Sequence, residues 1–439
     1  MTNTDNLLFL YYINHSFTGP CWFSWVVLFC LKISHFALKT LSRGPLFVYS
    51  IGLSCLGPIT PQGRPTTKSG KRIFMKVKFN RSALQEALNL VTSIIPSRTP
   101  KPILQCLRIV TEQDAVRISA TDMEAGITCL VSQVDISEAG DIVVPADKLS
   151  SIVRESFDEV IALEATESAV HLIGSDSRFT IYSHDPKQYP TIPGFEGEAE
   201  LEIKLSALQE GIEYTIFSAA RESTRYALNG ILWEVSGKKL SLVATDGRRL
   251  AKTTIALEKA AKLPENRIIV PAKTMSLLDK IPARDDGTVR IRFVNNQIVL
   301  ACETVVVSSN LVEGNFPKYD DIIPKDHDKK IMLPRDAVLS AVRRAALLAN
   351  EDSKGIKLAM DKGALVFTSR APETGDAKID MAIDYDAEPI EIGFNPQFLV
   401  DVLRVLKADE FELHLGQSDR PGLIKSGSNF LYIVMPVNL

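Results

Sequence analysis

The chain has 439 residues, of which 45% are hydrophobic and 23% are charged, with a formal net charge of −3. These fractions exclude a disordered or fibrous protein, and at about 150 residues per domain the length predicts three domains. An acidic balance gives no general basis for nucleic-acid binding, which depends on clustered Lys and Arg.

Residues 1–74 differ in composition from the rest of the chain. They carry seven Lys or Arg against one acidic residue, whereas residues 75–439 carry 43 against 52. The apolar run from Cys21 to Leu31 is 11 residues long, and crossing a bilayer takes about 20. The N-terminus also lacks the basic residues of a signal peptide. We expect an extension that is disordered or a misassigned start, on a cytoplasmic protein. Export with membrane attachment is the alternative hypothesis.

From Met75 onward, one pattern occurs three times. An alternating strand leads into an amphipathic helix at Val77, Leu201 and Lys330, and the first helix has apolar residues at Leu84 and Leu88. A second strand and helix follow in each unit, marked by Pro145, Pro271 and Pro396 at spacings of 126 and 125 residues. Proline suits a helix start because its fixed φ is nearly helical and its missing N–H would be unpaired there.

The other segments alternate apolar and polar residues between turn signals such as Asn295-Asn296, which predicts antiparallel strands. We therefore expect an α+β fold of three similar domains, each with antiparallel sheet and two helices. The predicted domains are residues 75–196, 197–325 and 326–439. A solenoid or a substrate-binding protein could also be built from such repeated units.

The sequence offers little for catalysis. It contains no phosphate loop, no G-x-S-x-G elbow and no H-E-x-x-H motif. The pairs Asp285-Asp286 and Asp320-Asp321 are candidates for a hydrolase built on repeated domains. Both pairs lie in turn-like stretches, so solvated turn residues are the favoured interpretation.

The histidines and cysteines of the body do not form a metal-binding pattern, so we predict no metal and no cofactor. They lack ligand or CxxC spacing and instead resemble surface or buried reduced residues. These residues are His171, His184, His327, His414, Cys106, Cys129 and Cys302.

Several longer strings carry a family resemblance. They are RTPKPIL from Arg98, RYALNGIL from Arg225, VATDGRRLA from Val243, LVEGNFPKYDDIIP from Leu311, EIGFNPQFLVDVL from Glu391 and the terminal VMPVNL. In order and spacing, residues 75–439 resemble the β subunit of bacterial DNA polymerase III, the replication sliding clamp. The resemblance implies a non-catalytic processivity factor. It also implies a head-to-tail homodimer that encircles duplex DNA and binds the polymerase III catalytic subunit, the clamp loader, and other polymerases and repair proteins.

A helix count agrees with a dimeric ring. Two helices in each of six domains, spaced by about 8–10 Å, form a circle about 100–120 Å around. Subtracting one helix thickness of about 10 Å leaves an opening of about 22–28 Å. Duplex DNA is wider than about 16 Å, so it fits inside twelve helices but not inside six.

The resemblance places DNA contacts at Arg98, Glu222, Arg225 and Tyr226. Further cations lie on the second helices, where the alternative is a solvated face balanced by Asp147, Glu155, Asp279 and Asp401. These cations are Lys148, Arg154, Lys273, Lys280, Arg404 and Lys407. Asp147 and Asp176 stand where the best-known member has arginines, and Glu222 and Ala227 replace a glutamine and a tyrosine. Lys148, Arg154, Arg178 and Arg221 are predicted to compensate.

The resemblance also implies a hydrophobic pocket between the second and third domains that captures short linear peptides. An apolar concavity with a few polar groups suits such a ligand. The matching residues are Leu228, Thr245, Gly247, Arg248, Arg249, Leu250, Pro317, Ile322, Asn395, Phe398, Val434, Met435, Pro436 and Val437. Asp321 replaces a basic residue there. An edge strand and a hairpin without a binding role are the alternative.

For the subunit interface, the resemblance pairs Leu347 and Leu348 of the third domain with Phe179 of the partner's first domain.

Overall fold

The computed structural model describes residues 74–438, except residues 222, 262, 264–265, 283–286, 325–327 and 350–354. The predicted extension therefore lies outside the described residues up to residue 73, as do Glu222, His327 and the pair Asp285-Asp286. Within the described part, no helix is long and apolar enough to cross a membrane.

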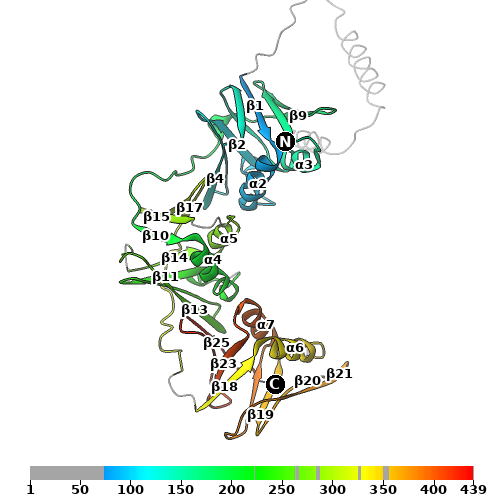
Figure 1. The fold of residues 1–439 in the computed structure, drawn as a ribbon, viewed down its shortest axis with the longest axis vertical. Helices are drawn as coiled ribbons and strands as arrows, with labels where there is room; N and C mark the ends of the chain where they lie inside the picture. Colours follow the sequence, from blue (N-terminus) through cyan, green and yellow to red (C-terminus); the bar gives the residue numbers. More distant parts are fainter. Residues whose placement is uncertain are drawn as a thin grey trace, which may run out of the picture. The chain divides into compact units, whose positions relative to one another are not determined.

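Three repeats follow one another along the chain (Figure 1). The first contains β1 (Met75–Asn80), α2 (Arg81–Val91), β2 (Cys106–Thr111), β3 (Val116–Thr121), β4 (Ala125–Val131), β5 (Val134–Glu138), β6 (Asp141–Pro145), α3 (Ala146–Glu155), β7 (Val160–Ala165), β8 (Ala169–Ile173) and β9 (Arg178–Tyr182). The second contains β10 (Leu201–Lys204), α4 (Leu205–Glu213), β11 (Gly230–Ser236), β12 (Lys239–Thr245), β13 (Arg249–Ala256), β14 (Arg267–Pro271), α5 (Ala272–Asp279), β15 (Thr288–Val294), β16 (Gln297–Cys302) and β17 (Val305–Asn310). The third contains β18 (Lys329–Pro334), α6 (Arg335–Ala346), β19 (Ile356–Asp361), β20 (Ala364–Ala371), β21 (Gly375–Ala382), β22 (Ile390–Phe394), α7 (Pro396–Val405), β23 (Glu410–Leu415), β24 (Gly422–Ser426) and β25 (Phe430–Val434).

The strands form four antiparallel sheets. Two sheets belong to single repeats and have the orders β5-β1-β7-β8-β9 and β21-β20-β19-β22. Two eight-stranded sheets are shared between neighbouring repeats, with the orders β10-β15-β16-β17-β4-β3-β2-β6 and β14-β11-β12-β13-β25-β24-β23-β18. Hydrogen bonds from β17 to β4 and from β25 to β13 therefore join the repeats. The predicted α+β fold of three similar domains is confirmed.

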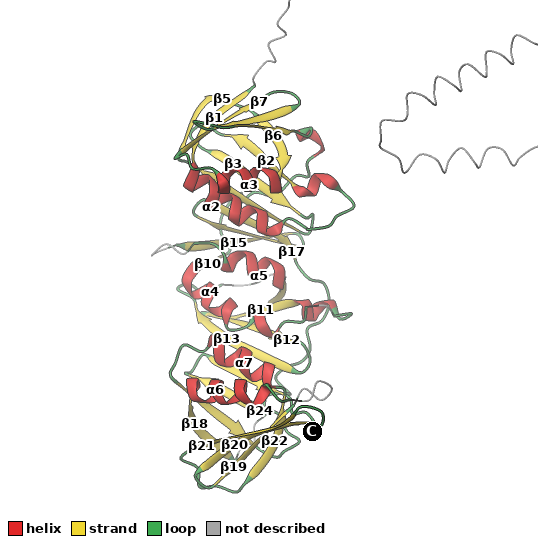
Figure 2. Ribbon diagram, turned by 90° about the vertical axis from the view of Figure 1, so that its right-hand side faces the viewer, coloured by secondary structure: helices red, strands yellow, loops and turns green. Residues whose placement is uncertain are grey.

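Each repeat has one pair of helices in mutual contact, namely α2 with α3, α4 with α5 and α6 with α7 (Figure 2). The expected amphipathic pattern holds in α2, where Leu84, Leu88 and Val91 are buried at helical spacing. The helix begins where predicted because the Asn80 side chain accepts a hydrogen bond from the Ala83 N–H at 3.1 Å.

The recurring prolines differ from the prediction in one detail. Only Pro396 is the first residue of its helix, whereas Pro145 and Pro271 end strands β6 and β14 and precede the helix as extended caps, with ψ of 122° and 137°. The residue equivalent to them in the third repeat is Asn395, whose side chain accepts from the Gln397 N–H at 2.9 Å. The predicted equivalence of Pro396 with Pro145 and Pro271 is therefore wrong by one residue.

The three cysteines within the described chain are buried and free, as expected for reduced core residues. Burial raises the pKa of Cys106 and of Cys129 to about 11. The thiols therefore remain protonated near neutral pH, which disfavours them as nucleophiles.

Candidate functional site

The predicted peptide-binding residues gather where β13 of the second repeat meets β25 of the third. In this ladder Leu250 is opposite Ile433 and Arg249 is opposite Val434. The tail after β25 then bridges the repeats, because Met435 N–H donates to the Arg248 carbonyl and Val437 N–H donates to the Gly393 carbonyl, both at 2.9 Å. The structure thus brings the β13 turn and the C-terminal tail together.

An apolar cluster lies on one face of this shared sheet. Leu250, Leu423 and Ile433 are buried in it together with Phe316 and Tyr319 of the connector between the repeats. Predicted residues adjoin this cluster, since Pro317 follows Phe316 and Ile322 precedes Ile323, which packs against it. Ile322 and Met435 remain 43% and 38% exposed, which leaves apolar surface for an apolar peptide residue.

The polar side of the same region is set by the β12–β13 turn. The Thr245 hydroxyl accepts from the Gly247 N–H at 3.1 Å and donates to the Arg249 carbonyl at 2.6 Å. Asp246 accepts from the backbone N–H groups of Arg248 and Arg249. Gly247 has a φ of +89°, and a β-carbon at this residue would meet no other atom within 4 Å. Glycine is therefore required by the backbone conformation and not by crowding.

The side chain of Arg249 contacts both the second and the third repeats, and little of it is exposed for recognition of a ligand. Its side chain is 11% exposed and pairs with Asp246 at 3.0 Å and with Asp401 of α7 at 2.6 Å. The same guanidinium donates to the Phe217 carbonyl at 2.6 Å and lies 4.5 Å from the centre of the Phe398 ring. Residues of the second repeat and of the third are therefore held around one cation.

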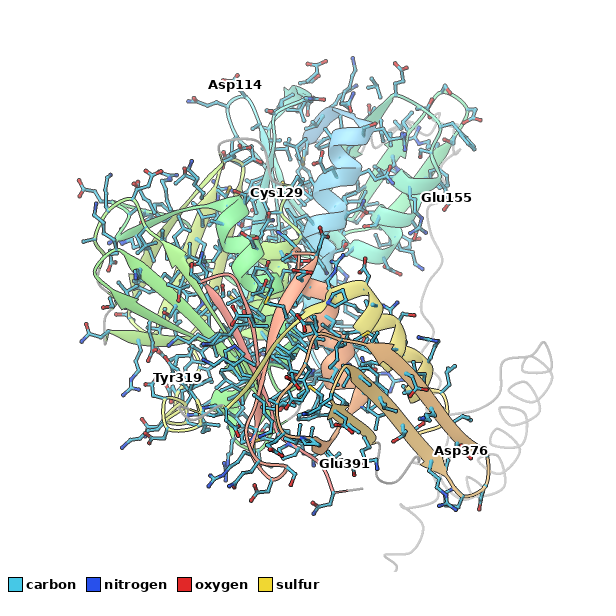
Figure 3. All side chains as sticks on the ribbon, turned by 60° about the horizontal axis from the view of Figure 1, so that its bottom comes forward. Asp114, Cys129, Glu155, Tyr319, Asp376 and Glu391 are labelled. Atoms are coloured by element: carbon cyan, nitrogen blue, oxygen red, sulfur yellow. The ribbon has the colours of Figure 1, made fainter. Side chains whose placement is uncertain are left out.

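The connector carries a second polar network. The Tyr319 hydroxyl donates to Glu234, and the Lys252 ammonium lies 3.0 Å from that hydroxyl and 4.7 Å from the ring centre. Burial, together with the hydrogen bond to Glu234, raises the pKa of Tyr319. The connector that packs on the apolar cluster is thus held by a tyrosine between two charged groups. Figure 3 labels Tyr319.

Three of the predicted DNA-binding residues line one groove, which lies mainly on the second repeat and is also lined by Glu124 of the first repeat and Asp401 of the third. Arg221, Tyr226 and Lys273 border a groove of about 900 Å³, and Tyr226 is 73% exposed. The loop before Tyr226 is shaped by Asn229, which accepts from the Ser223 N–H at 3.1 Å and donates to its carbonyl at 3.3 Å. Arg225 is exposed on the same loop.

Lys273 has a partner that its place in the sequence did not indicate. Its ammonium pairs with Asp122 of the first repeat and donates to the Ile94 carbonyl at 3.3 Å. Its charge is therefore partly neutralised at the junction of the first two repeats. Asp122 follows β3 as Asp246 follows β12, but Asp246 pairs with Arg249 of its own repeat, so this likeness in sequence did not indicate the contact between repeats.

The other predicted DNA-binding cations are dispersed and exposed. Lys148 pairs with its neighbour Asp147 at 3.1 Å and Arg154 with its neighbour Glu155 at 3.1 Å. Exposed positions are also found for Arg98, Lys280 and Arg178, the last on strand β9 away from the loop at Tyr226. Lys407, named for the same face, instead pairs with Glu210 of α4 at 3.1 Å.

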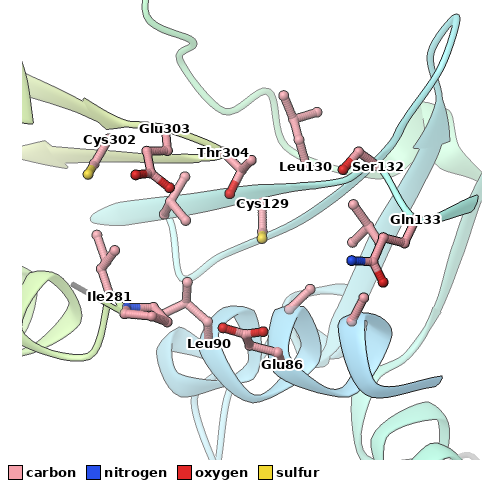
Figure 4. Close-up of a pocket in the computed structure, with 15 residues that line it drawn as sticks. Glu86, Leu90, Cys129, Leu130, Ser132, Gln133, Ile281, Cys302, Glu303 and Thr304 are labelled. Atoms are coloured by element: carbon pink, nitrogen blue, oxygen red, sulfur yellow. The ribbon is translucent and has the colours of Figure 1, made fainter. Parts of the chain in front are cut away.

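A smaller cavity of about 180 Å³ lies between α2 and the β16–β17 turn (Figure 4). Cys129, Cys302 and Glu86 are among the residues that line it. Its two thiols have raised pKa values because they are buried, so the cavity offers no activated nucleophile. At the next junction the ring of Tyr214 stacks on that of Phe430, with ring centroids 4.9 Å apart.

The acidic and histidine candidates that the structure describes do not lie together as a reactive centre. Asp320 and Asp321 are exposed, and among the described residues no group of three His, Cys, Asp or Glu is placed to hold a metal. His171 bonds to the Thr180 hydroxyl at 3.0 Å, and buried His414 bonds to Glu412 at 2.7 Å. Both are therefore satisfied histidines.

Comparison with known proteins shows the family of this chain. Three family models match in order: the N-terminal domain of the DNA polymerase III beta subunit over residues 75–193, its central domain over 202–318 and its C-terminal domain over 320–438. The chain belongs to the DNA polymerase III beta subunit family. Members of this family are sliding clamps, non-catalytic accessory subunits of DNA polymerase III, and the hydrolase hypothesis has no support.

Curated relatives match over their whole length. The beta sliding clamp of Pseudomonas putida is 32% identical over 368 residues, which is 83% of this chain and 100% of that protein. The clamp of Chlamydia pneumoniae is 27% identical over 83% of this chain and 99% of its own. The solved clamp of Pseudomonas aeruginosa has a TM-score of 0.78 at 31% identity, again covering 83% of this chain and 100% of that one.

Proposed function

We propose that two copies of this clamp close head to tail into a ring around duplex DNA in the cytoplasm. The ring tethers the polymerase III catalytic subunit, the clamp loader, and other polymerases and repair proteins through peptides bound at the junction of the second and third domains. We place these domains at residues 75–196, 197–325 and 326–439, with residues 1–74 outside the clamp.

The observation that carries this proposal is an edge strand with one unpaired side at each end of the array. At both internal junctions the last strand of one repeat pairs with a strand of the repeat before it. These pairs are β17 with β4, the strand after β3, and β25 with β13, the strand after β12. Among the described strands, β9 of the first repeat and β21 of the third hold the same positions but end their sheets. A second copy can supply β21 to β9 and β9 to β21, which satisfies both edges.

One row of side chains across a sheet shows which residues of the three repeats are equivalent. In each repeat the row begins three residues before the N-cap of the first helix and continues through the residues paired with it on neighbouring strands. The three rows are Val77, Leu163, Leu172 and Phe179; Leu201, Ile291, Leu300 and Val307; and Ile331, Leu413, Ile424 and Tyr432. Val307 and Tyr432 are 1% and 0% exposed at their junctions, whereas Phe179 is 41% exposed. Phe179 thus occupies the same position as the buried junction residues, but in the single chain no neighbouring repeat buries it.

Leu347 is the matching exposed residue at the other end. It lies thirteen residues after the cap of α6, as Phe217 lies thirteen residues after the cap of α4. Phe217 packs on Tyr432 with ring centres 5.7 Å apart, and Leu347 is 79% exposed. We therefore place Leu347 and its neighbour Leu348 on Phe179 of the partner.

For DNA, we assign the closest contacts to Arg221, Arg225 and Tyr226 on the exposed loop of the second repeat, with Arg98 from the first. Lys148, Arg154 and Lys280 add sequence-independent charge, and Lys273 adds less because Asp122 already neutralises it in part. Weak phosphate contacts suit a ring that must slide.

The DNA assignment predicts a change in salt dependence. Replacing Arg221 and Arg225 together by Ala removes two phosphate contacts, so the slope of log affinity against log salt concentration should fall in magnitude by about 2. The measurement is fluorescence anisotropy of a labelled duplex across a salt series. Lys362→Ala, at an exposed turn with its side chain paired to Asp386, is the matched control. An unchanged slope in the double variant contradicts the assignment of these arginines.

A further inference from the structure

The junction of the second and third repeats includes a polar contact beside its strands. Lys407, in the loop after α7, pairs with Glu210 at 3.1 Å and with Glu213 at 3.8 Å on α4 of the preceding repeat. Tyr214, the C-cap residue that follows that helix, stacks on Phe430. A loop after a second helix therefore rests on the last turn of the neighbouring first helix.

The equivalent loop at the free end of the first repeat can be located by counting. The following strand begins 14 residues after the helix start in both cases, from 396 to 410 and from 146 to 160. Phe157 is thus the counterpart of Lys407. On the neighbouring side, Glu213 and Tyr214 lie nine and ten residues after the cap of α4, and Arg343 and Arg344 lie nine and ten residues after the cap of α6.

The loop at Phe157 is exposed and acidic. Phe157 is 100% exposed, with Glu155, Asp158 and Glu159 beside it in the sequence. Asp158 accepts from the Ser175 N–H at 3.1 Å, which places the exposed Asp176 next to this loop. We call Glu155, Phe157, Asp158, Glu159 and Asp176 the acidic loop, and Figure 3 shows Glu155 at the end of its helix.

The counterpart on the third repeat is exposed and basic. Arg343 and Arg344 lie in the last turn of α6, and both are exposed. In the described part of the chain neither has an ion pair, and Arg344 donates only to the Ser340 carbonyl of its own helix at 3.3 Å. Leu347 follows on the same surface at 79% exposure.

We propose that the acidic loop docks on Arg343 and Arg344 of a second copy of this chain, with Phe157 packed against that helix turn. The inference rests on the proposed head-to-tail dimer and adds an electrostatic latch to it. The charges are reversed relative to the internal junction, where the helix is acidic and the loop residue is basic. Glu155 contributes least, because it already pairs with Arg154 at 3.1 Å.

Such a latch makes closure of the ring dependent on ionic strength. Exposed charges separated by about a Debye length, roughly 8–10 Å in physiological salt, are screened as salt rises. Opposite charge on the two faces also guides them together during association and disfavours pairing of like ends. The internal junctions are joined through the chain itself and do not share this dependence.

A charge-swap cycle on the full-length protein tests the latch. One variant carries Glu159→Lys with Asp176→Lys, a second carries Arg343→Glu with Arg344→Glu, and a third carries all four changes. Asp158 is kept because it holds the loop at Ser175. The dimer dissociation constant is measured by analytical ultracentrifugation at 50 and 500 mM NaCl, with circular dichroism to confirm folding.

We expect each single-sided reversal to weaken the dimer at least tenfold at 50 mM NaCl, and the four-fold variant to recover most of the loss. The differences should largely disappear at 500 mM NaCl. Glu138→Lys with Glu167→Lys, on exposed residues away from the acidic loop, is the matched control and should have no such effect. Phe157→Ser should weaken the dimer at both salt concentrations.

The outcomes separate the two proposals. If the unmodified chain is monomeric at all concentrations, the ring itself is overturned. If the unmodified chain is a dimer and neither charge reversal changes its dissociation constant, the ring stands and the latch is overturned. The same conclusion follows if the variant with all four changes does not recover the affinity of the unmodified dimer.

Discussion

Replacing Leu347 and Leu348 by Ala is expected to convert the dimer into monomers at micromolar concentration. A two-subunit ring has two identical interfaces, so the double variant truncates four side chains. At about 1 kcal/mol or more for each truncated interface side chain, the loss is about 4 kcal/mol. Because about 1.4 kcal/mol is tenfold in affinity, the dimer dissociation constant should rise by about a thousandfold. Gel filtration with light scattering measures the mass directly.

The matched control is Met332→Ala, another exposed apolar residue of the third repeat, at 54% exposure on β18. It should leave the mass of the dimer unchanged. Because Leu347 is exposed and Leu348 is only partly buried in the single chain, the monomeric variant should remain folded by circular dichroism. An intact dimer in the double variant contradicts the assignment of these leucines to the interface.

Replacing Arg249 by Ala is expected to destabilise the junction of the second and third repeats. The change leaves Asp246, Asp401 and the Phe217 carbonyl without the cation that they share. Removing one partner of a largely buried pair costs about 3–5 kcal/mol. The melting temperature of the third repeat should therefore fall by about 10–20 °C in calorimetry. Arg249→Lys should recover little, since one ammonium cannot reproduce the planar, multidentate contacts of the guanidinium.

Arg248→Ala provides the control at the adjacent position, because its side chain is exposed and its backbone carbonyl, which binds Met435, is retained. This variant should melt like the unmodified protein. Equal melting of the Arg249→Ala and Arg248→Ala variants would show that Arg249 does not join the repeats.

The fold was accessible from the sequence because hydrophobic periodicity reports burial directly. The alternation in β1 and the spacing of Leu84, Leu88 and Val91 in α2 predicted the elements that the structure contains. The predicted equivalence of Pro396 with Pro145 and Pro271 was wrong by one residue, because Pro145 and Pro271 cap their helices whereas Pro396 is the first residue of its helix. The pairing of β17 with β4 and of β25 with β13 had no local signal, since strand alternation defines a face and not a partner.

The site was only partly accessible for a related reason. Local strings identified the β12–β13 turn and the C-terminal tail, which the structure brings together through Arg248 and Met435. They could not show that Arg249 is enclosed by Asp401 and Phe217, because these residues are distant in sequence. Likewise Lys273 was predicted to be a DNA-contacting cation, and its pairing with Asp122 depends on the register between two repeats.

Retention on circular and linearised DNA tests the ring most directly. The clamp is loaded by a clamp loader onto nicked circular plasmid, unbound protein is removed by gel filtration, and half of the sample is then cut once by a restriction enzyme. A topological ring stays on the circle and slides off the free ends, so retention should fall to background after cutting. Equal retention on the circular and the linear DNA would contradict the account, because an ordinary DNA-binding protein does not respond to free ends.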